Sequence, residues 1–233
     1  MKIKEPLSSE SEQFLQKLDK YNELSVIGPL FKPDKASIDQ SHGPIIFIDG
    51  GYNFQNLFQT HEKFYIGDND SNREVLHQST TQILLEKNKD YSDLKFCLEL
   101  LKHKKNLQSL MFRGFTGARL DHELMNLSEF FHFVKQMSSL KTIQIDEKLL
   151  LINKDFTLEL EHSGTFSVFS FETMELSLEG RCEYPLKDKT ISPPLSSLTL
   201  SNNANGLFFL RSTKPCFLYL PNQSIAQYNI RQV

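Results

Sequence analysis

Short apolar runs, each stopped by a glycine or a polar residue, recur through the first two thirds of the chain. The clearest is Ile45–Ile48, which ends abruptly at Asp49. A run without polar alternation is typical of a parallel strand that is covered on both faces. The pattern predicts strands over Leu24–Ile27, Ile45–Ile48, Lys63–Ile66, Thr81–Leu85, Leu107–Phe112 and Leu140–Ile145.

Between these runs, apolar residues recur at the 3.6-residue spacing of helices. Ser8–Tyr21 forms one such stretch. A second follows Ser92, whose hydroxyl is expected to cap the helix. A third follows the glycine-spaced turn Arg113–Gly117, and the amide groups at the start of such a helix could bind an anion. The apolar stripes of the second and third helices are Leu94, Cys97, Leu98 and Leu101, and Leu124, Leu127, Phe131 and Val134.

Helical periodicity disappears beyond Asp146. Short runs then dominate, and Asn205-Gly206 is typical of a hairpin turn. We therefore predict two domains: an α/β domain over 1–147, with a Rossmann-like parallel sheet and helices, and an antiparallel β-sandwich or flattened barrel over 148–233. The runs expected to be strands are Leu149–Ile152, Phe156–Leu160, Thr165–Phe171, Met174–Leu178, Leu198–Ser201, Leu207–Leu210 and Phe217–Leu220.

Composition narrows the class of partner. The chain has 233 residues, enough for a substantial core, and a formal charge of -3, so no basic surplus is available for a nucleic acid or an anionic membrane. Its three cysteines, Cys97, Cys182 and Cys216, are widely spaced and lack a Cys-x-x-Cys pair. The polar start of the chain and the absence of a long apolar run predict no membrane span, and the cysteine usage favours the cytoplasm.

Acidic residues follow several of the predicted strands. Asp68 and Asp70 come directly after Gly67, and Asp49, Asp93 and Asp121 lie at comparable junctions. An Asp-x-Asp turn alone is often a solvated loop tip. Converging carboxylates, however, repel one another by roughly 4 kcal/mol per pair at ~4 Å, which calls for a cation. Oxygen-only ligands favour Mg²⁺, which takes its remaining ligands from water and substrate phosphates. Neither common glycine-rich phosphate-loop pattern is present.

These segments, in their order, resemble the motif set of the thiamine pyrophosphokinases. The matching segments are Asp49–Asn53, Gly67–Ser71, Lys89–Asp93 and Gly114–His122. The resemblance implies an α/β nucleotide-binding catalytic domain and a β-sandwich thiamine-binding domain. It also implies that the diphosphate of ATP is transferred to the hydroxyl of thiamine, with release of AMP, and that the protein is a homodimer.

Carried over residue by residue, the resemblance assigns roles in both domains. It implies that Asp68, Asp70 and Asp93 bind Mg²⁺ or diphosphate, that Asp121 adds a carboxylate and that Arg119 holds a phosphate. The residues implied to bind the nucleotide are Asp49, Gly50, Asn53, Ser71, Lys89, Ser92 and Gly117. Those implied to approach thiamine are Thr199, Ser201, Asn202 and Tyr184.

The sequence departs from the family at two points. Asn69 stands where relatives usually carry an apolar residue between the two aspartates, and the chain has no tryptophan to stack on the vitamin. Two alternatives therefore stay open. One is the same transfer to another hydroxymethyl heterocycle, such as a pterin. The other is a nucleotide-binding relative without turnover.

Overall fold

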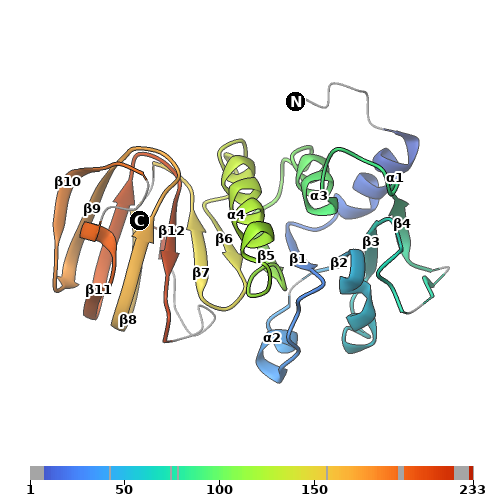
Figure 1. The fold of residues 1–233 in the computed structure, drawn as a ribbon, viewed down its shortest axis with the longest axis horizontal. Helices are drawn as coiled ribbons and strands as arrows, with labels where there is room; N and C mark the ends of the chain where they lie inside the picture. The colour runs from blue at the N-terminus through green and yellow to red at the C-terminus, as the bar shows by residue number, and fades with distance from the viewer. Residues whose placement is uncertain are drawn as a thin grey trace. The chain divides into compact units, whose positions relative to one another are not determined.

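The chain folds into two compact units, Met1–Glu129 and Phe130–Val233 (Figure 1). The computed structural model describes residues 8–41, 43–73, 75–77, 79–155, 157–193, 197–222 and 231–232. Within these ranges, no helix is long and apolar enough to cross a membrane.

The first unit contains a parallel sheet. Its strands are β1 (Glu23–Ile27), β2 (Ile45–Ile48), β3 (Lys63–Gly67), β4 (Thr81–Leu84) and β5 (Ser109–Arg113). They lie in the order β5-β1-β2-β3-β4, and neighbouring strands pair in parallel. All four residues of β2 are buried, as its apolar run predicts. The carboxyl ends of parallel strands share one edge of the sheet, so the residues that follow β2 and β3 are brought together there.

Helices cover both faces of this sheet (Figure 1). Phe64 of β3 packs against Phe14 at a ring distance of 5.0 Å on one face, and Tyr65 packs against Tyr52 at 5.5 Å on the other. Successive side chains of a strand point to opposite faces, which explains the division. The helices are α1 (Ser9–Leu18), α2 (Lys35–Asp39), the 3₁₀ helix η1 (Asp49–Leu57), α3 (Asp93–Leu101) and α4 (Leu120–Val134), whose last residues belong to the second unit.

Two helical predictions have different outcomes. Ser92 caps α3 as expected, since its Oγ accepts a hydrogen bond from the Lys95 N–H at 3.1 Å. Leu124, in contrast, was predicted on the buried stripe of α4 but is 51% exposed, while Phe131 and Val134 are buried. The first turns of α4 are solvent-exposed, so helical spacing alone overestimates the length of its buried face.

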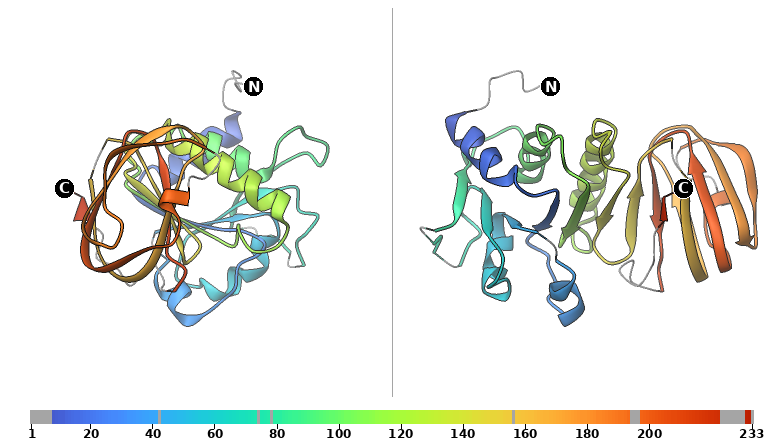
Figure 2. Two further views of the ribbon diagram at one scale, coloured as in Figure 1. Left: turned by 60° about the vertical axis from the view of Figure 1, so that its left-hand side comes forward. Right: turned by 180° about the vertical axis from the view of Figure 1, so that it is seen from behind.

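The second unit contains an antiparallel sheet with the strand order β10-β9-β11-β8-β12-β7-β6, in which β13 also pairs with β8. Leu150 of β7 and Ile191 of β10, from strands far apart in this order, belong to one apolar core. The sheet therefore curls around that core (Figure 2). The elements are β6 (Thr142–Ile145), β7 (Leu149–Ile152), β8 (Thr157–Phe169), β9 (Met174–Cys182), β10 (Leu186–Ile191), the 3₁₀ helix η2 (Ser197–Thr199), β11 (Asn202–Ser212), β12 (Cys216–Tyr219) and β13 (Arg231–Gln232).

Three predictions in this half were wrong. Asn205 and Gly206 lie inside β11, where they pair with Ser163 and His162 of β8, and do not form a hairpin turn. The φ of Gly206, 125°, accompanies a register shift between β11 and β9 at this point. The two runs predicted on either side of Gly164 form the single strand β8; Phe156 lies outside the described residues. The run that begins at Leu198 is helical at its start and not a strand.

The junction of the two units lies within α4, whereas the sequence places the domain boundary near Glu147. Strand β6, predicted as the last strand of the α/β domain, falls within the second unit and pairs antiparallel with β7. The functional division into a nucleotide-binding domain and a thiamine-binding domain stays a prediction.

Candidate active site

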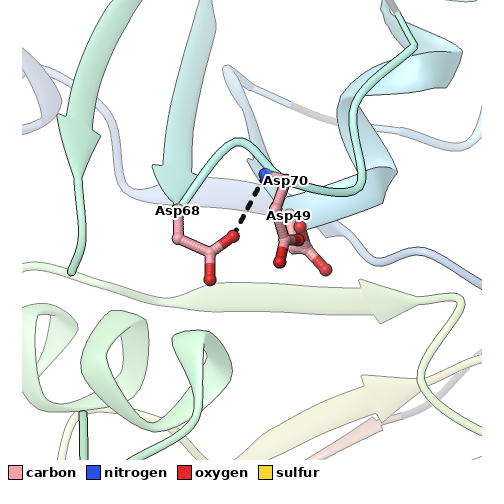
Figure 3. Close-up of side chains that lie close together, drawn as sticks. All are labelled: Asp49, Asp68 and Asp70. Atoms are coloured by element: carbon pink, nitrogen blue, oxygen red, sulfur yellow. Dashed lines mark hydrogen bonds between the residues drawn. The ribbon is translucent and has the colours of Figure 1, made fainter. Parts of the chain in front are cut away.

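Three carboxylates meet at the carboxyl edge of the parallel sheet. Asp49 follows β2, and Asp68 and Asp70 follow β3, its neighbour in the sheet. One oxygen from each residue lies within 4.8 Å of the others, and the three side chains point toward a common space (Figure 3). Gly67 permits this approach, because a Cβ at that position would lie 3.0 Å from the Cα of Asp49.

Hydrogen bonds shape the turn that carries two of these acids. The Asp70 N–H donates to Asp68 Oδ1 at 3.1 Å, as the dashed line in Figure 3 shows. Ser71 Oγ donates to Asp70 Oδ1 at 2.9 Å. Asn69 has a φ of 63°, a left-handed conformation that asparagine adopts more readily than most residues. The departure from the family at Asn69 therefore suits the backbone of this turn.

Lys89 links the turn to a fourth acid. Its Nζ lies 2.8 Å from Asp93 Oδ1 and 3.6 Å from Asp68 Oδ2. The close contact with Asp93 is an ion pair without the geometry of a directed hydrogen bond. Asp93, expected to be a metal ligand, is thus paired with a lysine, while Asp49, expected near the nucleotide, joins the carboxylate group.

Burial and mutual repulsion perturb these acids. Burial raises the pKa of Asp49, and the charges of Asp93, Asp68 and Asp70 raise it further. Burial also raises the pKa of Asp93, although Lys89 opposes that effect. Burial acts in the same direction on Asp68, but the hydrogen bond from Asp70 and the charge of Lys89 prevail, so its pKa is lowered. Asp49 Oδ1 is buried and has no hydrogen-bond partner among the described residues.

Asn53 holds the loop after β3 against the start of η1. Its Nδ2 donates to the carbonyl groups of Gly50 at 2.9 Å and Ser71 at 3.2 Å, while its Oδ1 accepts from the Arg73 N–H at 2.7 Å. Gly50 lies close by, since a Cβ there would be 3.5 Å from the Cβ of Ser71. The amide of Asn53, predicted to organise the nucleotide, is here engaged in positioning the loop.

Arg119 and Asp121 pair with each other and are not part of the carboxylate group. Arg119 Nε lies 3.1 Å from Asp121 Oδ1, Nη2 lies 2.5 Å from Oδ2, and the side chains are 71% and 63% exposed. The guanidinium lowers the pKa of Asp121 to about 2. Gly117, predicted to bind phosphate, has a φ of 93° and donates its N–H to Glu123 Oε2 at 3.1 Å.

The residues predicted to contact thiamine divide into exposed and buried pairs. Tyr184 is 56% exposed, and Ser201 is exposed with its N–H bonded to Ser167 Oγ. Thr199 and Asn202 are each 1% exposed. Asn202 Oδ1 accepts from the Tyr184 N–H at 3.0 Å, and its Nδ2 donates to the Tyr184 carbonyl at 2.8 Å. In this structure, Asn202 holds the backbone of Tyr184 and does not present its amide to a ligand.

Sequence reasoning missed one polar group beside the carboxylates. Tyr65 of β3 is fully buried, yet its hydroxyl accepts a hydrogen bond from the Asn69 N–H at 3.0 Å. An aromatic residue in an apolar run is typical of a strand core, and no sequence signal separates this tyrosine from its neighbours.

Fold and site together define the class of protein. It has an α/β unit with an oxygen-only acidic site at the carboxyl edge of its parallel sheet, followed by an antiparallel β unit. Residues 37–142 match the family model described as the catalytic domain of thiamin pyrophosphokinase. All four motif segments lie within this range, and the resemblance to thiamine pyrophosphokinases is confirmed.

Solved structures agree with this result. The thiamine pyrophosphokinase of Bacillus subtilis is 21% identical, with a TM-score of 0.65 over 84% of this chain and 96% of that chain. The enzyme of Candida albicans is 11% identical, with a TM-score of 0.63 over 85% and 88%. That of Geobacillus thermodenitrificans is 19% identical, with a TM-score of 0.62 over 87% and 99%. These likenesses show the fold. No match to the sequence was found among curated proteins.

Proposed function

We propose that this protein transfers the diphosphate of ATP to the hydroxyl of thiamine in the presence of Mg²⁺, giving thiamine diphosphate and AMP. The observation that carries the proposal is the convergence of Asp49, Asp68 and Asp70 within the segment that matches the catalytic-domain model.

The carboxylate group suits a magnesium ion. Its donors are all oxygens, which a small hard cation prefers, and few carboxylates leave positions open for water and phosphate. The buried Oδ1 of Asp49 has no hydrogen-bond partner among the described residues. A cation would compensate the negative charge of this carboxylate. Asp49, Asp68 and Asp70 would hold the ion, whose positive charge would offset the negative charge of the phosphates.

In the proposed reaction, the hydroxyl oxygen of thiamine forms a bond to the β-phosphorus of ATP. The bond from that phosphorus to the oxygen of the α-phosphate breaks, AMP leaves with the bonding electrons, and the hydroxyl proton passes to solvent. The protein contributes positioning and charge. Asp49, Asp68 and Asp70 hold the cation, and Lys89, beside Asp68, supplies a positive charge for the diphosphate. Ser92 Oγ accepts the capping hydrogen bond and can still donate its own proton.

Thiamine recognition is assigned to the exposed residues of the second unit. Tyr184 offers an exposed ring that can stack on a heterocycle, and Ser201 offers an exposed hydroxyl. The resemblance also supports a homodimer. Light scattering at micromolar concentration should give twice the chain mass of 27.0 kDa, and a particle of the single-chain mass would contradict the dimer.

The decisive experiment measures AMP release from ATP and Mg²⁺ with no acceptor, with thiamine, and with a pterin alcohol. Thiamine-dependent AMP, formed in equal amount to thiamine diphosphate, supports the proposal. AMP released only with the pterin alcohol would keep the chemistry and replace the acceptor. Nucleotide binding without AMP release in any arm would favour the relative without turnover.

A further inference from the structure

A buried hydroxyl lies directly beneath the turn that carries two of the site's carboxylates. Tyr65 belongs to the apolar cluster between the sheet and η1 and is fully buried. Because side chains alternate along a strand, residues 65 and 67 face the same side of the sheet. The Tyr65 hydroxyl therefore passes the position of Gly67 and reaches Asn69, whose N–H it accepts at 3.0 Å.

Gly67 leaves room for this contact. A Cβ at that position would lie 2.5 Å from the Tyr65 hydroxyl oxygen and 3.0 Å from the Cα of Asp49. The missing side chain thus has two consequences: the hydroxyl can reach the turn, and the turn can approach Asp49.

The bonded amide belongs to the residue between the two acids. Asn69 is in the left-handed region, with a φ of 63°, and its N–H fixes the peptide plane that links it to Asp68. The next N–H, that of Asp70, donates to Asp68 Oδ1. Holding the Asn69 amide therefore orients both acids, and Asp49 presents its buried, unpartnered Oδ1 beside them, as judged over the described residues.

We propose that Tyr65 is a positioning residue for the cation site: its hydroxyl holds Asn69 so that Asp68 and Asp70 face Asp49. This inference rests on the proposed function for the nature of the ligand, a divalent cation. It adds a group that touches neither the cation nor the substrate and acts through the backbone of the turn.

Tyr52 provides a matched control in the same apolar cluster. It is also fully buried, and its hydroxyl is bonded to Thr80 Oγ1 at 3.1 Å and accepts the His77 N–H at 3.0 Å. Its hydrogen bonds hold the far end of the loop and leave the turn at Asn69 untouched. Tyr52→Phe therefore removes an equally buried hydroxyl from the same core.

The test titrates Mn²⁺ into the full-length protein without nucleotide and follows free Mn²⁺ by electron paramagnetic resonance. The Mn²⁺ dissociation constant should rise roughly tenfold in Tyr65→Phe, the scale expected for one lost hydrogen bond, and stay at the wild-type value in Tyr52→Phe. Both variants should melt at lower temperature than the wild type when no metal is present. A Tyr65→Phe variant with wild-type Mn²⁺ affinity, or an equal loss of affinity in both variants, would overturn the inference.

A second pair of variants tests the geometry. Gly67→Ala should also weaken Mn²⁺ binding, and the added methyl should cost less affinity in a Tyr65→Phe background, where the oxygen 2.5 Å away is gone. Fully additive losses would contradict the steric coupling on which the inference depends.

The inference and the proposed function fail in different ways. Wild-type protein that binds Mn²⁺ tightly but releases no thiamine-dependent AMP would remove the function and keep the role of Tyr65. Wild-type protein with normal turnover, together with an unchanged Mn²⁺ affinity in Tyr65→Phe, would keep the proposed function and remove the role of Tyr65. Wild-type protein that binds no Mn²⁺ would overturn the role of Tyr65 together with the cation site.

Discussion

A buried polar group of the second unit contrasts with one of the first unit. In the second unit, Asn153 is 7% exposed, and its Nδ2 lies 3.1, 3.0 and 2.8 Å from the carbonyl oxygens of Val134, Met137 and Leu140. In the first unit, Asp49 Oδ1 is equally hidden and has no hydrogen-bond partner among the described residues. Buried polar groups are normally satisfied, so an unsatisfied one that faces other charges is a candidate ligand site. The comparison supports a ligand-binding role for Asp49 and a structural role for Asn153.

Removing one carboxylate from the first unit should have the largest effect. Asp70→Asn should lower the rate of thiamine-dependent AMP formation at least ~10³-fold, because it removes a cation ligand and its charge. The melting temperature of the metal-free variant should equal or exceed that of the wild type, since repulsion is relieved.

Asp155→Asn in the second unit is the matched control. Asp155 is exposed and has a φ of 65°, which asparagine tolerates. The activity of the Asp155→Asn protein should therefore stay at the wild-type level. A large loss of stability in metal-free Asp70→Asn would show that Asp70 supports the fold instead.

Removing the hydrogen bonds between the Asn202 side chain and the Tyr184 backbone should chiefly change stability. Asn202→Ala leaves the Tyr184 N–H and carbonyl without their partner and should lower the free energy of unfolding by about 1–3 kcal/mol in urea titrations. Asn205→Ala, an exposed position in the same strand, should change it by less than about 0.5 kcal/mol. Equal effects at the two positions would weaken the contrast between the units.

The raised pKa of Asp49 predicts a pH dependence with a defined sign. Above its folded pKa, ionised Asp49 is half-buried beside other acids and destabilises the metal-free fold. Protonation relieves this as the pH falls toward the unfolded value of 3.8. Asp49→Asn, which suits the φ of 48°, should therefore be more stable than wild type at pH 7.

That advantage should shrink as the pH is lowered through the folded pKa of Asp49. Thermal unfolding of both proteins in EDTA between pH 7 and pH 4 measures it. An advantage that grows on acidification would mean that ionised Asp49 stabilises the fold.

The smallest expected effect concerns the acceptor. Tyr184→Trp should lower KM for thiamine by up to about tenfold and leave kcat nearly unchanged, because ring stacking acts on substrate and transition state alike. Tyr219→Trp, at another exposed tyrosine of the second unit, should change neither constant. A kcat that changes with KM at position 184 would place the ring closer to the reacting atoms than proposed.

The sequence was sufficient where local signals decide the structure. The run Ile45–Ile48 forms β2 with the predicted ends, and Ser92 caps α3. Both features depend on only a few adjacent residues, a continuous apolar run and a capping hydroxyl. It was insufficient where distant partners decide. Strand β8 runs through Gly164, and Gly206 lies in a strand, because the long antiparallel pairing of β8 with β11 overrides the turn propensity of glycine.

The candidate site shows the same limit. The sequence placed acids at strand ends, but which acids meet depends on strand order and side-chain reach. Asp49 joins Asp68 and Asp70 because β2 and β3 are neighbours. Asp93 is instead paired with Lys89, whose Nζ lies closer to Asp93 than to Asp68. The mutual pair of Arg119 and Asp121 could not be separated from a phosphate-binding arginine by spacing alone.

The contact of Lys89 with two acids has a consequence for the order in which ligands arrive. Lys89 is the one lysine that contacts this group of four aspartates among the described residues, so negative charge prevails at the site. The site therefore repels a nucleotide without a cation and attracts a cation. We therefore expect ATP to enter accompanied by its cation, and free ATP in excess over the metal to act as a poor ligand. Substrate inhibition by uncomplexed ATP should consequently be weak, while activity should follow the concentration of the metal–nucleotide complex.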